Sequence, residues 1–491
     1  MRLRNRAFAA TLAQQTIKGM TMRAMGRFMA GWLLTAASLT APTIVQAQNR
    51  PDQKAFFGLY KELVETNTTL SSGSCTQAAA QIGARMKSAG YADADLTYFS
   101  VPEHPKDGGL VAVLKGSDAS IKPMLLLGHL DVVEAKREDW VRDPFKLIEE
   151  GGYYYARGTV DDKAQAAIWS DAMIRLKTSN YKPKRTIKLA LTCGEETTFA
   201  WNGAQYLAAS RPDLIAAEFA LNEGGGGRLD DTGKRQLLAI QVGEKAAQNY
   251  TFLATNPGGH SSQPTPENAI YELADAVKAV QGYEFPVAFT DTTRAFFAAS
   301  AKAMPGEMGN AITALLANPQ DKAADAIVSR DKAMHSTLRT TCVATLLSAG
   351  HAENALPQRA TANVNCRIFP GESVDGTLAK LKELAGAKVM VTANQPVRPT
   401  AIPPTLDPKI MGPVTKVAAK HFPGLPILPL MSTGATDGIF FEAIGIPVYG
   451  APGVFIDKDM SGIHGLNERI RVASLYDGRD YLFDLVKAFA G

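Results

Sequence analysis

The stretch Met124-Leu-Leu-Leu-Gly-His-Leu-Asp131 (MLLLGHLD) combines an apolar run with polar residues at its end. Its apolar start, residues 124–127, is too short for a helix and is typical of a strand that is covered on both faces. A glycine, a histidine and an aspartate follow within the next four positions. In open α/β sheets, functional sites form outside the carboxyl ends of the strands. The stretch therefore predicts a buried strand with a candidate ligand, His129, at its carboxyl end.

Segments on both sides of this stretch alternate between strand and helix. Leu110–Leu114 and Thr186–Leu191 are further short apolar runs, and residues 162–178 carry apolar positions at helical spacing. Such alternation predicts an α/β fold, a layered catalytic domain with a largely parallel mixed sheet.

The pattern changes near Lys245. Strands are expected at Gln248–Thr255, Thr337–Leu347, Arg359–Ile368 and Lys388–Thr392, with helices at Glu267–Val280 and Leu378–Leu384. This order is typical of a small α+β domain of ferredoxin-like type. An Ala-rich, helical insertion at 285–335 has no role that the sequence reveals.

The domain boundaries follow from these shifts in pattern. We predict a leader at 1–47, a first catalytic part at 48–245, an inserted dimerisation or lid domain at 246–400, and a second catalytic part at 401–491.

The N-terminus has the character of an export signal. An apolar run, Phe28–Ala41, follows Arg23 and Arg27, and Val45-Gln46-Ala47 fits a small-residue cleavage site. The run is shorter than the roughly 20 apolar residues that a membrane span needs. A buried core helix is the alternative, disfavoured because the preceding segment is basic and lacks acids. We expect a periplasmic or secreted protein whose mature chain has no membrane span.

The charge balance argues against a nucleic-acid partner. The formal net charge is +4, but residues 1–47 hold six Lys or Arg and no acid, so the remainder carries −2. No basic stripe remains that would bind a phosphate backbone.

The four cysteines are Cys75, Cys193, Cys342 and Cys366. They show no CxxC pairing, so a structural zinc ribbon is not indicated. We favour buried thiols. The alternative is a bridge between Cys342 and Cys366, which lie in strand-like runs 24 positions apart, in an oxidising compartment.

Five motifs place histidines or carboxylates at strand ends. They are GHLD (128–131), GTVDDK (158–163), GEET (194–197), LNEGGGG (221–227) and GIHGLNE (462–468). Alone, the first could be a chance His-x-Asp and the second could be acids at a helix N-terminus. The flexible glycine loop after Glu223 could be a phosphate-binding loop, but no GKS or GxGxxG follows. Adjacent carboxylates such as Glu195 and Glu196, however, repel each other unless a cation neutralises them. Together the motifs offer an N/O ligand set for paired zinc ions.

The order of these motifs resembles the dizinc exopeptidase family of glutamate carboxypeptidases, aminoacylases, acetylornithine deacetylase and succinyl-diaminopimelate desuccinylase. The resemblance covers essentially the whole mature chain. It implies that His129 and Glu223 bind one Zn²⁺, that Glu196 and His464 bind the other, and that Asp161 bridges them. Co²⁺ or Mn²⁺ would suit the same ligands.

The resemblance also implies a catalytic apparatus. Asp131 would orient His129, and Glu195 would be the general base that passes a proton from water to the leaving amine. The peptide bond between Asp161 and Asp162 would be cis.

In the inserted domain the resemblance implies substrate contacts and a homodimer. His260 would reach the active site of a partner subunit and stabilise the oxyanion. Asn354 and Arg367 would hold the carboxylate of the substrate, together with the loop that contains Gly434. Solvated side chains are the plainer interpretation of His260 and Arg367, although a guanidinium suits bidentate carboxylate binding.

One departure concerns the loop 432–439. The family loop often carries Arg or Lys shortly after its Asp, whereas Ile439 and Phe440 stand here. One cationic contact with the substrate would then be missing.

We therefore expect an exported zinc-dependent exopeptidase, of carboxypeptidase or dipeptidase type, that cleaves an amide bond near a free carboxylate. An N-acyl amino acid deacylase with the same metal pair is the alternative. A non-catalytic binding protein is disfavoured because Glu195 and every inferred ligand are present.

Overall fold

The structure, a computed structural model, describes residues 50–197 and 201–491. The predicted leader at 1–47 lies outside these residues. Across the described ranges, no helix is both long and apolar enough to cross a membrane.

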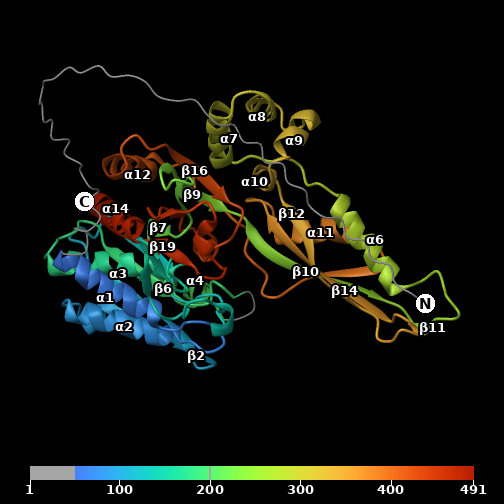
Figure 1. The fold of residues 1–491 in the computed structure, drawn as a ribbon, viewed down its shortest axis with the longest axis horizontal. Helices are drawn as coiled ribbons and strands as arrows, with labels where there is room; N and C mark the ends of the chain where they lie inside the picture. Colours follow the sequence, from blue (N-terminus) through green and yellow to red (C-terminus); the bar gives the residue numbers. More distant parts are fainter. Residues whose placement is uncertain (1–49, 198–200) are drawn as a thin grey trace, which may run out of the picture. The chain divides into compact units, whose positions relative to one another are not determined.

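A large mixed sheet, ten-stranded in the described residues, carries the strand-end motifs (Figure 1). Its order is β1-β2-β6-β3-β7-β17-β9-β8-β18, with β16 beside β9. The strands are β1 (Leu96–Val101), β2 (His104–Leu114), β3 (Met124–His129), β6 (Ile187–Thr192), β7 (Phe219–Asn222), β8 (Gly225–Leu229), β9 (Arg235–Glu244), β16 (Ile427–Ser432), β17 (Val448–Gly450) and β18 (Phe455–Ile456). The run β6-β3-β7-β17 is parallel, whereas β1, β2, β8 and β9 add antiparallel pairs. The α/β prediction with a mixed sheet is confirmed.

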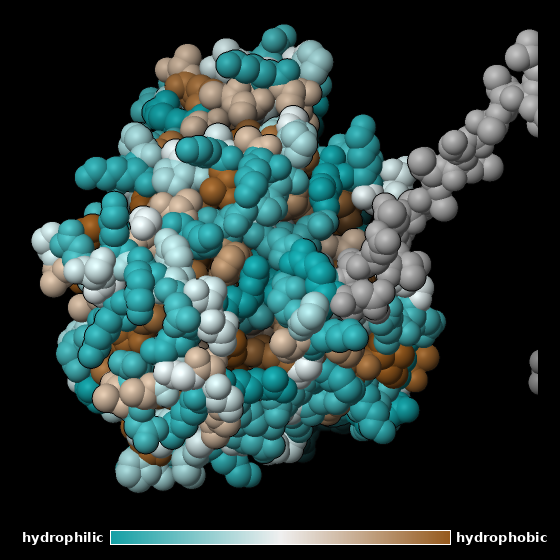
Figure 2. All heavy atoms as spheres, turned by 90° about the vertical axis from the view of Figure 1, so that its left-hand side faces the viewer, coloured by the Kyte–Doolittle hydropathy of each residue, from teal (hydrophilic) through white to brown (hydrophobic). Residues whose placement is uncertain are grey.

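Helices cover this sheet. They are α1 (Pro51–Glu65), α2 (Cys75–Ser88), α3 (Lys163–Thr178), α4 (Gly203–Ser210), α5 (Pro212–Ile215), α12 (Pro408–His421), α13 (Gly438–Glu442) and α14 (Val472–Ala490). α3 packs between α1 and α14, and the indole of its buried Trp169 donates a hydrogen bond to the carbonyl of Leu127 at 3.1 Å. Figure 2 shows a largely hydrophilic face with small, separate apolar patches, as expected where amphipathic helices turn their apolar sides inward.

A four-stranded antiparallel sheet has the order β12-β14-β10-β15. Its strands are β10 (Ala246–Thr255), β12 (Thr341–Ala349), β14 (Arg359–Ile368) and β15 (Val389–Ala393), and it packs with α6 (Ala269–Gly282) and α11 (Val374–Ala385). The predicted order of elements is present. The strand expected from residue 337 begins only at Thr341, because the preceding helix continues to Thr337.

The insertion forms four helices with a hydrophobic core of their own. They are α7 (Asp291–Ala303), α8 (Glu307–Ala317), α9 (Lys322–Val328) and α10 (Lys332–Thr337). Phe297, Ile312 and Val328 are among the buried residues of that core. α7 also packs on β16, so the insertion touches the large sheet.

Two small sheets complete the described fold. One consists of β11 (Gly259–His260) and β13 (Ala355–Leu356), and the other of β4 (Ile148–Glu150), β5 (Tyr153–Tyr155) and β19 (Arg469–Arg471).

The preference for buried thiols was wrong, because both cysteine pairs are bonded. Cys342 and Cys366 face each other across β12 and β14, with Cα atoms 4.1 Å apart. Cys75 and Cys193 are 118 positions apart in sequence, but the start of α2 lies beside the end of β6. Cross-strand register and tertiary packing, which spacing does not reveal, create both pairs.

The glycine run after Glu223 is also not a flexible loop. Gly225–Leu229 is strand β8, which pairs with β9 and β18. A Cβ at Gly225 would collide with the carbonyl of Ala239, and one at Gly227 would collide with the ring of Phe455. These glycines permit close backbone packing.

Candidate metal centre

Three neighbouring parallel strands bring the first site residues together. His129 is the last residue of β3, Glu195 follows β6 by three positions, and Glu223 directly follows β7. Since β3 lies between β6 and β7, their carboxyl ends meet at one edge of the sheet.

Asp161 stands between two histidines. Its Oδ1 lies 3.1 Å from Nε2 of His129, and its Oδ2 lies 3.1 Å from Nε2 of His464. His129 Nε2 is also 3.7 Å from Glu223 Oε1, and His464 Nε2 is 2.9 Å from Glu196 Oε2. One oxygen toward each histidine is the geometry that a bridging carboxylate requires. The five predicted ligands thus form two overlapping groups, each with its donor atoms within 4.8 Å of one another.

The electrostatics of this cluster fit a pair of cations. Burial raises the pKa of Glu195 and of Glu223 well above the usual range, and neighbouring acids raise both further. Hydrogen bonds to Asp161 and Glu196 raise the pKa of His464 to about 10. The protein alone therefore offers too little positive charge for these carboxylates to ionise together. Imidazole and carboxylate donors without thiolate suit Zn²⁺, Co²⁺ or Mn²⁺.

Asp131 connects two parts of the centre. His129 Nδ1 lies 3.1 Å from the carbonyl oxygen of Asp131 and 3.5 Å from its Oδ1. Asp131 Oδ2 accepts a hydrogen bond from the backbone N–H of Glu196 at 2.9 Å. Its position fits the predicted orienting role for His129, and it also holds the Glu195–Glu196 turn.

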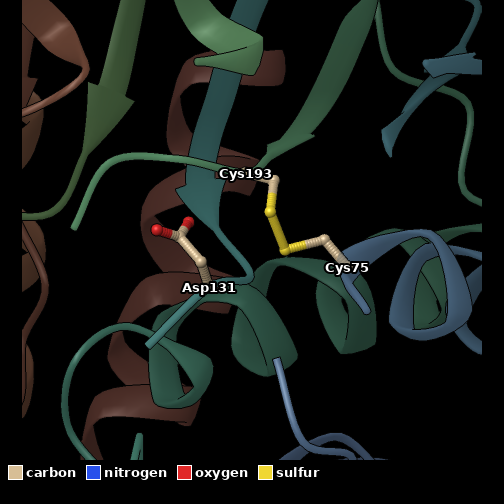
Figure 3. A group of neighbouring side chains, drawn as sticks. All are labelled: Cys75, Asp131 and Cys193. Carbon is tan, nitrogen blue, oxygen red and sulfur yellow. A yellow bond between two sulfur atoms is a disulfide. The ribbon is translucent and has the colours of Figure 1, made fainter. Parts of the chain in front are cut away.

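A disulfide lies beside Asp131. Figure 3 shows the Cys75–Cys193 bridge next to the Asp131 carboxylate, at the end of β6. Because their sulfur atoms bond to each other, the two cysteines are not free to ligate a metal. The bridge instead fixes the residue before Gly194-Glu195-Glu196.

Glu468 is a site residue whose role the sequence did not reveal. Its Oε2 accepts hydrogen bonds from Arg157 and from the N–H of Gly158, and its Oε1 accepts from the N–H groups of Val160 and Asp161. Glu468 thereby holds the segment that presents the bridging carboxylate. The only available signal was its place in GIHGLNE. The predicted cis peptide bond between Asp161 and Asp162 is confirmed.

A polar pocket with a cavity volume of about 260 Å³ adjoins the cluster. Glu195, Glu196 and His464 line one part of it, and Arg367 and Arg398 line another. Arg367 was expected here, whereas Arg398 was not. Asn249, Asn365, Thr436 and Asp437 also line this polar pocket.

An apolar pocket with a cavity volume of about 160 Å³ adjoins the same cluster through Asp161 and Glu223. Its apolar lining is Val160, Ala164, Pro452, Val454, Ile456, Met460 and Ile463. The two pockets share no lining residue.

Three predicted substrate contacts lie outside both linings. His260 and Asn354 are exposed on adjacent segments, where the N–H of Ser261 donates to the carbonyl of Asn354 at 3.0 Å. Gly434 immediately precedes Ala435 and Thr436, which do line the polar pocket. Within one subunit, then, His260 and Asn354 are not part of the centre.

Comparisons with known proteins agree with this fold. The sequence profile described as peptidase family M20/M25/M40 matches residues 125–488. The human N-fatty-acyl-amino acid synthase/hydrolase PM20D1 is 31% identical over 387 residues, covering 76% of this chain and 75% of that protein. A probable carboxypeptidase S-like 2 of Dictyostelium discoideum is 26% identical over 392 residues, covering 77% and 74%. The M20 family metallo-carboxypeptidase Sso-CP2 of Sulfolobus solfataricus superposes with a TM-score of 0.69 at 18% identity, covering 89% of this chain and 99% of that one.

Proposed function

This chain belongs to peptidase family M20/M25/M40, and from that premise we propose that it hydrolyses N-acyl amino acids to a carboxylic acid and a free amino acid. The proposal assigns two divalent cations, zinc by preference, to the centre. His129 and Glu223 would hold one, Glu196 and His464 the other, with Asp161 between them. We propose zinc as the native metal.

The observation that carries the proposal is the contrast between the two pockets that adjoin the metal centre. The polar pocket contains two guanidinium groups and suits a carboxylate. The apolar pocket is lined mainly by aliphatic side chains, although Asp162, Gln165 and Arg228 also line it, and it suits an acyl chain. An N-acyl amino acid has a carboxylate on one side of its amide bond and an acyl group on the other.

The chemistry would divide between the cations and Glu195. A bound pair of divalent cations would polarise the amide carbonyl and acidify water. Glu195, which lines the polar pocket beside the cluster, would accept a proton from that water and give it to the leaving nitrogen. The C–N bond breaks, the acyl carbon keeps the hydroxyl group, and the nitrogen leaves as an amine.

One relative supports the hydrolysis of N-acyl amino acids. The N-fatty-acyl-amino acid synthase/hydrolase is more than 30% identical over three quarters of both chains. Exopeptidase activity is the second candidate, favoured by the carboxypeptidase S-like relative and by the same carboxylate-binding pocket. A peptide's N-terminal part would then occupy the apolar pocket.

A substrate panel separates these activities. The purified protein would receive N-acyl phenylalanines of increasing chain length, their carboxamide counterparts, and unblocked dipeptides, with products identified by mass spectrometry. We expect release of phenylalanine from the N-acyl acids, with kcat/KM rising with chain length. Cleavage of the dipeptides alone would replace this proposal with the exopeptidase.

A matched pair of variants tests the apolar pocket. Met460→Trp would narrow it, whereas Leu466→Trp changes an exposed residue nearby in the chain that does not line it. We expect Met460→Trp to lower kcat/KM for long acyl chains and to spare acetyl substrates, with Leu466→Trp near wild type. Equal effects of the two variants would contradict the assignment.

Export and a homodimer belong to the same proposal. The two disulfides fit an oxidising compartment outside the cytoplasm. Edge strand β12 exposes Val343, Leu346 and Leu347, with 59–69% of each residue accessible. An exposed apolar edge strand suits pairing with a second copy of the chain.

A further inference from the structure

The short helix α13, which follows Asp437, lacks the cation that the family resemblance leads us to expect shortly after this Asp. Ile439 and Phe440, which follow Gly438, are 1% and 5% exposed, and their side chains have no polar group to offer a substrate. Ile439 nevertheless lines the polar pocket. The cation that is missing from the sequence is therefore also missing from this wall of the polar pocket.

The guanidinium of Arg398 lies over the ring of Phe440, although Arg398 comes from the segment after β15. Its guanidinium carbon is 5.2 Å from the centroid of the Phe440 ring, a cation–π distance. Arg398 also lines the polar pocket. The aromatic residue that replaces the expected cation thus supports a cation from a different segment.

The backbone of Arg398 is fixed independently of that contact. Its N–H donates to Oε1 of Gln248 at 3.0 Å. Gln248 is buried, and its Nε2 donates to the carbonyls of Asn249 and Asn394. Arg398 is therefore held at its backbone and at its guanidinium. This restraint lowers the conformational entropy that its half-buried side chain would lose on binding a ligand.

The charge around Arg398 indicates an anion. In the described part of the chain, no carboxylate lies within 4.0 Å of its side-chain nitrogens, unlike many other arginines of the protein. Burial lowers the pKa of Arg367, the second guanidinium in the pocket, the carboxylate of Glu195 raises it, and the positive charge of Arg398 lowers it further. Glu195, Glu196 and Asp437 also line this pocket. Where the proposed cations offset the charge of these acids, the two guanidinium groups favour a ligand that carries a negative charge.

We propose that Arg398, seated on Phe440, binds the substrate carboxylate together with Arg367 and makes the enzyme specific for acids over amides. This inference rests on the proposed amide hydrolysis. Arg398 supplies, from the linker between β15 and α12, the cationic contact that residues 437–440 lack.

The test compares matched substrates in matched variants. We expect Arg398→Gln to raise KM for an N-acyl amino acid on the order of ten- to a hundredfold, the effect of losing a hydrogen bond to a charged group. Its kcat/KM for the corresponding carboxamide should stay at the wild-type value. Arg398→Lys should recover part of the preference for the acid. Phe440→Leu should reduce that preference less than Arg398→Gln does.

Arg294→Gln is the control, because Arg294 lies 4.9 Å from the centroid of the Phe289 ring but lines neither pocket. It should leave both substrates unaffected. Equal losses on acid and carboxamide in Arg398→Gln, or an unchanged preference in both Arg398 variants, would overturn the inference. A wild-type protein that cleaves neither substrate would instead refute the proposed function.

Discussion

Glu195 combines burial with a place beside the proposed cations. Its raised pKa arises from burial and from the nearby charges of Glu196 and Asp437. Bound cations would offset these contributions and leave Glu195 able to exchange a proton. The proposed division between a base and a neighbouring ligand therefore depends on two adjacent residues with different surroundings.

We predict that Glu195→Gln lowers kcat by about 10²–10⁴-fold, the typical contribution of a general base. Metal content, measured by inductively coupled plasma mass spectrometry, should remain near two per chain. The Glu196→Gln variant should have a lower metal content. A metal-poor Glu195→Gln protein would show that Glu195 is a ligand instead.

A second residue, Glu442, makes the free energy of unfolding depend on pH. Burial and the neighbouring Glu244 raise the pKa of Glu442 to about 9, and its Oε2 has no hydrogen-bond partner among the described residues. For a carboxyl whose folded pKa is raised, the stabilisation is present below the unfolded pKa and is lost as pH rises toward the folded value.

Glu442→Gln should therefore raise the free energy of unfolding by about 1–3 kcal/mol near pH 8 and by much less near pH 5. Denaturant titrations of both proteins at the two pH values would measure this. A gain that does not depend on pH would contradict the titration of Glu442.

At the scale of elements, the Cys75–Cys193 bridge ties α2 to the end of β6. The second bridge, Cys342–Cys366, joins two strands that already pair. The first bridge is next to Asp131, whose carboxylate receives the N–H of Glu196. The two bridges thus provide an internal comparison.

We predict that Cys75→Ala with Cys193→Ala lowers activity and metal affinity, because the Glu195–Glu196 turn loses its anchor. Its unfolding free energy should fall by about 2–5 kcal/mol. Cys342→Ala with Cys366→Ala should keep the activity of the centre. Calorimetry and zinc titration with a chromogenic chelator would compare them, and equal loss of metal affinity in both would contradict this role.

For the whole molecule, the position of His260 gives a test of the proposed homodimer. His260 is exposed and lines neither pocket in its own chain. If it completes the centre of a partner, an active enzyme needs His260 from one chain and Glu195 from the other.

Two inactive variants should then complement each other. When His260→Ala and Glu195→Gln are mixed and allowed to exchange subunits, about a quarter of wild-type activity should return, because half of the dimers hold one complete centre. Leu346→Lys with Leu347→Lys, which places charge on β12, should prevent this recovery. Activity of His260→Ala alone at the wild-type level would contradict action between subunits.

Much of the fold and of the candidate site was predictable from sequence, because it depends on local pattern. Apolar runs such as 124–127 specify buried strands, and the polar residues that directly follow a strand must emerge at its carboxyl end. His129, Glu195, Glu196 and Glu223 could therefore be expected at one edge of the sheet, whereas their individual roles and that of Asp161 came only from the family resemblance of the motif order.

Tertiary structure alone decided the contacts between segments that are distant in sequence. Neither spacing nor composition pairs Cys75 with Cys193, brings Glu468 to the N–H of Asp161, or seats Arg398 on Phe440. The glycines of β8 likewise show their purpose only against Ala239 and Phe455. The local sequence pattern limits the structure that each residue forms with its near neighbours. Packing determines which distant groups line the same pocket, and therefore which charges interact there.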